Sequence, residues 1–216
     1  MKIELSGVGK RFNREWIFRN VSFSFQSGSS YAVTGANGSG KSTLLQTIGG
    51  MIQQSEGMIT YTQNKPLVPE KVYQTISLCA PYIDLIEEMT LIEFLQFHKQ
   101  FKSFLQPLDI NKIISIVGLE NSASKQIQHY SSGMKQRVKL AQAIFSDTEI
   151  LLLDEPCSNL DLKGIELYHN LIQKYCTNRL VIVCSNDKVE YSFCKEIIEM
   201  QSFKNNFAAP IAHHDK

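Results

Sequence analysis

The stretch Gly35-Ala36-Asn37-Gly38-Ser39-Gly40-Lys41-Ser42, followed by Thr43, decides how the rest of the chain is interpreted. It matches G-x-x-x-x-G-K-[ST], the pattern of a loop that surrounds a polyphosphate with main-chain N–H groups. Glycine permits the positive φ angles and the close approach to an anion that such a loop needs. Lys41 supplies a positive charge for the terminal phosphates, and Ser42 supplies an oxygen ligand for Mg²⁺. We therefore predict that these nine residues bind a nucleoside triphosphate.

The segments on either side of the loop support this interpretation. Ser30–Thr34 predicts a short buried strand that enters the loop, and Lys41–Ile48 predicts a helix that leaves it and ends at Gly49-Gly50. The N-terminus of such a helix presents unpaired N–H groups and the positive end of a dipole to an anion. A glycine-rich turn without a nucleotide is the alternative, and the strand–loop–helix order makes it the weaker one.

The overall composition excludes some classes of function. The 216 residues include 22 Lys and Arg and 21 Asp and Glu, a net charge of +1, so the charge does not favour a nucleic acid as partner. The five cysteines are scattered and odd in number, which indicates free thiols in a reducing compartment: Cys79, Cys157, Cys176, Cys184 and Cys194. The N-terminus lacks the build of a signal peptide, and no apolar run has the length of a membrane span. We expect a cytoplasmic protein whose membrane contacts are made through another polypeptide.

Two segments ahead of the loop predict an antiparallel β layer. Ile3–Val8 and Ile17–Phe25 have the composition of strands, and the second alternates apolar side chains with serines. Phe12 lies between them, and its ring could stack on a nucleotide base. Packing in the core explains Phe12 equally well, so both interpretations stay open.

An acidic pair follows a second buried strand. Ile150–Leu153 is a continuous apolar run, as expected for a parallel strand buried on both faces, and Asp154 and Glu155 come directly after it. Because parallel sheets bind ligands at the carboxyl ends of their strands, Asp154 is placed to hold Mg²⁺. Glu155 is then a candidate general base toward an attacking water. Capping of the next turn is the alternative, which the phosphate loop in the same chain makes less favoured.

A second anion site is predicted after Tyr130. Ser131, Ser132 and Gly133 have the pattern of an N-capped helix start, and their small side chains leave room for a phosphate. A simple helix cap explains the same residues, so the residues alone leave this choice open.

The order of these motifs resembles the ATP-binding subunit of ABC transporters over nearly the whole chain. The resemblance implies ATP and Mg²⁺ as cofactors, and it assigns Phe12 to the adenine-stacking position. Ser131 and Gly133 match the small residues of the family signature, which is Tyr-Ser-Ser-Gly-Met here where Leu-Ser-Gly-Gly-Gln is usual. In the family this segment contacts the γ-phosphate held by a second subunit. Ser158 to Asp161 match the loop that passes between the two sites.

Two positions depart from the family pattern. Pro81 follows the predicted strand Ile76–Ala80, where a glutamine usually ligates Mg²⁺ and senses the γ-phosphate; proline lacks that oxygen, although it fixes φ at the hinge. Asn186 occupies the position of the usual switch histidine and can donate a hydrogen bond to phosphate without carrying charge. Since charged donors are roughly twice as strong, we expect binding and dimerisation to persist and hydrolysis to be slow.

The predicted organisation is a single α/β domain over residues 1–216. It consists of a phosphate-loop NTPase core with a mostly parallel sheet, an N-terminal antiparallel β layer and an inserted α-helical subdomain. The insert is predicted from a capping box at Thr90 and Glu93, which opens a helix over Leu91–Phe101, and from a second helix capped by Asp109. The predicted parts are the core with its β layer, the insert with the signature helix, and a loose tail: 1–81 and 147–202, 82–146, and 203–216.

The sequence leaves two classes of function open. The first is an ATPase that acts as a homodimer or with a paralogous subunit and drives an integral membrane permease docked near Tyr82–Glu88. Such a chain would lie at the inner face of the membrane, peripheral through its permease, with no nucleic-acid partner. The second is an ATP-gated binding or regulatory module in which occupancy is the signal. A small-molecule kinase is less favoured, because the Ser-x-Gly helix start and the Asp-Glu strand would then be coincidences.

Overall fold

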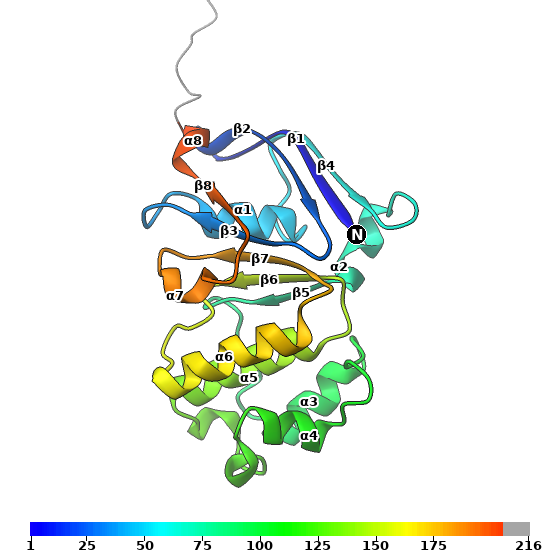
Figure 1. Cartoon of the computed structure of the whole chain (residues 1–216), viewed down its shortest axis with the longest axis vertical. Helices are drawn as coiled ribbons and strands as arrows, with labels where there is room; N and C mark the ends of the chain where they lie inside the picture. The colour runs from blue at the N-terminus through cyan, green and yellow to red at the C-terminus, as the bar shows by residue number, and fades with distance from the viewer. Residues whose placement is uncertain (205–216) are drawn as a thin grey trace, which may run out of the picture.

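The computed structural model describes residues 1–204, which form two β-sheets with helices packed against them (Figure 1). Residues 205–216, and with them most of the predicted tail, lie outside the described part. The helices and strands are, in chain order, β1 Lys2–Phe12, β2 Glu15–Gln26, β3 Ser30–Thr34, α1 Lys41–Ile48, β4 Glu56–Thr62, α2 Pro69–Thr75, β5 Ile76–Cys79, α3 Leu91–Lys99, α4 Ile110–Ile116, α5 Ser132–Phe145, β6 Ile150–Asp154, α6 Leu162–Tyr175, β7 Leu180–Cys184, α7 Lys188–Tyr191, β8 Glu196–Glu199 and α8 Gln201–Lys204. No helix within residues 1–204 combines the length and the apolar character needed to cross a membrane.

The larger sheet is parallel throughout, in the strand order β5-β6-β7-β3-β8. Leu153 near the end of β6 lies beside Cys79 of β5 and Val183 of β7. The carboxyl ends of neighbouring strands therefore share one edge, and the loops that follow them meet there. The parallel sheet, the antiparallel layer and the α/β class are as predicted.

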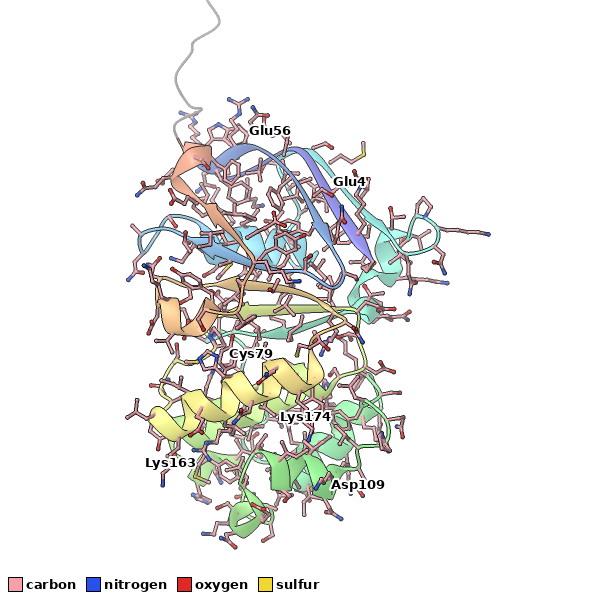
Figure 2. All side chains as sticks on the ribbon, viewed as in Figure 1. Glu4, Glu56, Cys79, Asp109, Lys163 and Lys174 are labelled. Atoms are coloured by element: carbon pink, nitrogen blue, oxygen red, sulfur yellow. The ribbon has the colours of Figure 1, made fainter. Side chains whose placement is uncertain are left out.

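This sheet divides the apolar core into two parts. In β6, Ile150 and Leu152 face a core shared with α1 and the antiparallel sheet, whereas Leu151 and Leu153 face a core shared with α5 and α6. Figure 2 shows Cys79 on this second side, between the sheet and the helices. Each fully buried side chain of this size stabilises the fold by roughly 1.5–3 kcal/mol. A strand buried on both faces has little freedom to shift, so the residues at its end are well positioned.

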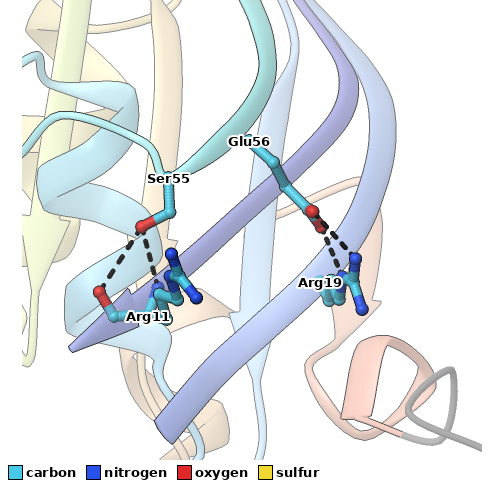
Figure 3. A network of polar contacts seen from close by, with 4 residues as sticks. All are labelled: Arg11, Arg19, Ser55 and Glu56. Atoms are coloured by element: carbon cyan, nitrogen blue, oxygen red, sulfur yellow. Dashed lines mark hydrogen bonds and ion pairs between the residues drawn. The ribbon is translucent and has the colours of Figure 1, made fainter. Parts of the chain in front are cut away.

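The N-terminal layer is a three-stranded antiparallel sheet in the order β2-β1-β4. Glu56 of β4 reaches across β1 to Arg19 of β2, with Nε–Oε1 and Nη2–Oε2 distances of 2.7 and 3.0 Å (Figure 3). Gly9 of β1 makes this crossing possible, because a Cβ there would lie 2.6 Å from Oε1 of Glu56. Nearby, the main-chain N–H of Arg11 donates to Ser55 Oγ at 3.1 Å and ties the end of β1 to the start of β4.

The insert between β5 and β6 contains both predicted helices. Thr90 Oγ1 accepts from the N–H of Glu93, whose carboxylate in turn accepts from the N–H of Thr90 at 2.8 Å, so the capping box is present. Asp109 caps α4 by accepting from the N–H of Lys112 at 2.7 Å. Helix α3 ends at Lys99, two residues before the predicted end at Phe101. The N–H groups of Gln100 and Phe101 donate to carbonyls three residues earlier in the chain, which tightens the last turn.

Two glycines have nearly equal φ angles but different surroundings, so substitutions there distinguish the cost of backbone strain from the cost of steric overlap. Gly57 and Gly28 have φ angles of 79° and 77°. A Cβ on Gly57 would overlap the carbonyl of Gly7 in the neighbouring strand, whereas one on Gly28 would meet nothing within 4 Å. Each change to alanine costs about 1–2 kcal/mol for the left-handed backbone. We expect Gly57→Ala to lose about 2 kcal/mol more than Gly28→Ala in urea unfolding; equal losses would contradict this packing of β4 on β1.

Candidate functional site

The phosphate loop links β3 to α1 and requires glycine at defined positions. Gly35 and Gly40 have φ angles of 145° and 100°. A Cβ on Gly35 would lie 2.9 Å from Ser39 Oγ, and one on Gly40 would lie 2.6 Å from Cγ2 of Ile17. Larger residues would therefore distort the loop, which explains the glycines in structural terms.

The lysine of the loop folds back over it. Lys41 is 6% exposed, and its Nζ donates to the carbonyl oxygens of Gly35 at 2.6 Å and Ala36 at 3.4 Å. Helix α1 begins here with Gly40 as N-cap and no side-chain cap. Both acceptors are neutral carbonyl oxygens, which do not neutralise the positive charge of the ammonium group. This charge can therefore attract an anion bound at the helix N-terminus.

Asp154 lies at the carboxyl end of β6, beside the loop, with 2% of its surface exposed. Burial raises the pKa of its carboxyl group, while a hydrogen bond from Ser42 and the charge of Lys41 act in the opposite direction. The hydroxyl of Ser42 and this carboxylate thus form a pair of hard oxygen donors. Residues 1–204 contain no cluster of three or more acidic, His or Cys ligands. A donor pair of this kind fits Mg²⁺, which usually takes one or two protein oxygens together with phosphate and water.

Glu155 has a strained backbone next to this pair. Its φ of 44° is in the left-handed region, which costs about 1–2 kcal/mol for a residue other than glycine. The conformation is held by its N–H, which donates to Cys184 O at 2.9 Å, and by its carbonyl, which accepts from Ser158 N at 3.1 Å. Its side chain is exposed at the sheet edge. Backbone strain is often found at functional sites, so the positive φ of Glu155 supports a functional role for its carboxylate.

The loop after Glu155 is anchored by a buried carboxylate that the sequence analysis missed. Glu190 is 5% exposed, and its Oε1 accepts from the N–H of Cys157 at 2.7 Å. Its main-chain carbonyl accepts from the hydroxyl of Tyr168 at 2.8 Å. Glu190 therefore connects α6 and α7 to the segment that leads from Glu155 toward Ser158.

Asn186 contacts the phosphate loop directly. Its Oδ1 accepts from the N–H of Gly35 at 3.2 Å, and its Nδ2 donates to Oδ1 of Asn37 at 3.1 Å. The position predicted to sense the γ-phosphate thus lies beside the loop. Its side-chain amide is occupied there by two neutral hydrogen bonds.

The predicted signature lies apart from the phosphate loop. Ser131 caps α5 by accepting from the N–H of Met134 at 3.3 Å. Gly133 allows close approach of the next loop, since a Cβ there would lie 3.0 Å from Asn159 O. Asp161 caps α6 and pairs with Arg137 on α5 at 3.6 Å. Helix α5 packs on the opposite side of the parallel sheet from α1 (Figure 1), so one chain does not bring the signature onto its own loop.

Phe12 and the hinge after β5 complete the predicted set. The ring of Phe12 is 46% exposed at the end of β1, with Lys10 Nζ 4.9 Å from its centre, which disfavours the core alternative. Its contact with a base stays a prediction. Pro81 accepts from Lys139 through its carbonyl oxygen at 2.9 Å. Tyr82, predicted as part of a docking surface, is 40% exposed.

Comparison with known proteins identifies the family. Residues 18–158 match the sequence family described as ABC transporter. This chain belongs to that family, as one of its ATP-binding domains. The domain is 34% identical over 200 residues to the uncharacterized ABC transporter ATP-binding protein YybJ of Bacillus subtilis, a match that covers 92% of each chain.

Further relatives extend the likeness. The domain is 31% identical over 176 residues to the cytochrome c biogenesis ATP-binding export protein CcmA of Reclinomonas americana, covering 78% of this chain and 77% of that one. Among solved structures, the dimeric ATP-binding cassette MJ0796 in a post-hydrolysis state, bound to ADP and Pi, has a TM-score of 0.79 at 25% identity. That match covers 91% of this domain and 93% of the cassette.

The carboxyl group of Glu190 predicts a pH dependence of stability. Burial raises its pKa above the ordinary value of 4.5, so the fold favours the protonated form. The protonated carboxyl group therefore adds to the free energy of unfolding below pH 4.5, and this stabilisation is lost as the pH rises through the raised pKa. Glu190→Gln keeps the acceptor oxygen but does not titrate. We expect the stability of this variant relative to the wild type to increase as the pH rises from below 4.5 toward neutrality.

The measurement is urea unfolding of both proteins across this pH range. Glu166→Gln, which changes an exposed residue of α6, is the matched control and should follow the wild type at every pH. A constant difference between Glu190→Gln and the wild type would show that Glu190 does not titrate differently in the fold.

Proposed function

We propose that this ATP-binding domain binds MgATP and hydrolyses it in a head-to-tail dimer, and that the resulting motion drives a separate membrane transport subunit. The observation that carries the proposal is the division of the site. Lys41, Ser42, Asp154 and Glu155 converge at the carboxyl edge of the sheet, whereas Ser131 lies on the other side of the sheet. A second copy, placed head to tail, would present its Ser131 to the triphosphate.

Each residue then has a distinct task. Lys41 and the main-chain N–H groups from Gly35 to Ser42 would bind the phosphates, and Ser42 with Asp154 would hold Mg²⁺, which neutralises phosphate charge when bound. Glu155 would accept a proton from the attacking water. The loop of Ser158 and Asp161 would connect the two sites of the dimer.

The permease partner is proposed to dock in a groove next to the hinge. Its walls include Ile83, Leu85 and Asp84 from the insert, with Lys135 of α5 opposite, where Lys135 pairs with Glu87 at 2.6 Å. Apolar side chains flanked by both signs of charge suit a helix of another polypeptide. Docking there would hold the domain at the cytoplasmic face of the membrane as a peripheral subunit. The relatives named as transporter ATP-binding proteins support this assignment.

An ATP-gated regulatory module is the second candidate. Asn186 supports it, because its neutral amide already bonds to Gly35 and Asn37 and replaces a group that can carry charge. In that case nucleotide occupancy, and not turnover, would be the signal. We propose slow hydrolysis in either case; single-turnover rates of the dimer that match those of histidine-containing family members would contradict this.

Glu155→Gln distinguishes the two candidates. We expect the variant to bind MgATP and to form a stable dimer, while hydrolysis falls by at least about 10²-fold because the general base is lost. Hydrolysis is measured as phosphate release and dimerisation by sedimentation velocity. When the variant is reconstituted with the permease, transport should be lost if the protein is a transport ATPase. Function should stay largely intact if the protein is an ATP-gated module.

The exposed Glu196→Gln on β8 is the matched control and should behave as the wild type in every assay. Hydrolysis by Glu155→Gln at the wild-type rate would refute the assignment of the general base.

A further inference from the structure

A cavity lies at the amino ends of the parallel strands, on the sheet edge opposite to Asp154. It has a volume of about 470 Å³ and is enclosed by the second half of α6 and by the starts of β3, β7 and β8. None of the residues of the phosphate loop lines it. Small-molecule sites have volumes of roughly 300–1,000 Å³, so this cavity is large enough to hold a ligand of its own.

Hydrogen bonds tie the walls of the cavity together. The N–H of Val181 at the start of β7 donates to the carbonyl of Ser29 at 3.2 Å. The hydroxyl of Ser30 donates to the carbonyl of Phe193 at 3.1 Å, and its own carbonyl accepts from the N–H of Lys195 at 2.9 Å. The cavity therefore has a defined shape before a ligand arrives, which lowers the entropic cost of binding.

The interior of the cavity is apolar, and its mouth carries polar side chains. Ile172 and Val181 are 6% and 2% exposed, whereas Gln173 and Lys195 are exposed and His169 is half-buried. Within residues 1–204, the side chains of His169, Gln173 and Lys195 form no hydrogen bond or ion pair. Unpaired donors at the rim of an apolar cavity suit a ligand that combines an apolar body with a polar head.

The charge of the lining favours an anionic head. Among the described residues no Asp or Glu lines the cavity, whereas Lys195 and Arg179 both do. Arg179 is 6% exposed, and its Nη atoms donate to neutral oxygens: Ile144 O at 2.7 Å, Ser77 Oγ at 2.8 Å and Thr148 Oγ1 at 2.5 Å. Asp147 and Glu149 offset part of this charge without forming an ion pair with it. The potential at the cavity is therefore positive, and a buried charge is screened less than an exposed one.

We propose that this cavity binds a small amphipathic carboxylate, such as a short unbranched fatty acid. The carboxylate accepts hydrogen bonds from Lys195 and Gln173 at the mouth, and the hydrocarbon chain packs on Ile172 and Val181. Burial of the chain supplies affinity, and the charged head fixes the orientation. The inference goes beyond the proposed function, because it needs neither ATP nor a second copy of the chain.

Calorimetry of the nucleotide-free chain with octanoate tests this site. We expect saturable binding of one octanoate per chain, with octanol and octylamine bound at least about tenfold more weakly, because neither offers a negative head. Lys195→Glu should lower the affinity for octanoate at least about tenfold and raise that for octylamine. Gln173→Trp places a large ring at the mouth and should weaken the binding of octanoate.

Lys163→Glu is the matched control, since it makes the same change of charge at an exposed position of α6 that does not line the cavity. Its affinity for octanoate should equal that of the wild type. The absence of saturable octanoate binding would overturn the inference and would leave a packing gap under α6. Equal affinities for octanoate and octylamine, or an unchanged affinity of Lys195→Glu for octanoate, would overturn it as well.

Discussion

The candidate site depends on the parallel register of the central sheet. Because neighbouring strands run in one direction, the loop after β3, the turn after β5 and the acidic pair at the end of β6 lie at the same edge. The strands are held by apolar side chains on both faces, so the edge groups have little freedom to separate. The buried Asp154 carboxylate and the Lys41 ammonium can then be held close together before a ligand arrives, which lowers the entropic cost of binding.

The same sheet separates the two halves of the proposed ATP site. Helix α1 and the phosphate loop lie with one part of the core, while α5, which begins after Ser131, packs on the other part (Figure 1). In our proposal each chain is therefore incomplete and is completed by a second copy. The turn after β5 contacts the second half, because the carbonyl of Pro81 accepts from Nζ of Lys139 on α5 at 2.9 Å.

The parts of the fold and site that depend on consecutive residues were predictable from the sequence. Gly35–Ser42 carries its pattern within eight positions, and the apolar run before Asp154 indicates a buried parallel strand. The contact of Glu190 was not predictable in this way. Its carboxylate accepts from a partner far away in the sequence, the N–H of Cys157. Only the packing of α7 and of the loop after β6 brings these two residues together.

The most direct test of a shared site is complementation between two inactive chains. Lys41→Ala removes the phosphate-binding charge but keeps the signature, whereas Ser131→Arg blocks the signature but keeps the loop. Each variant alone should hydrolyse no ATP. An equal mixture should recover about a quarter of the wild-type rate, since half of the dimers are mixed and each has one complete site. A mixture as inactive as its components, or full activity of Ser131→Arg alone, would contradict a site built from two copies.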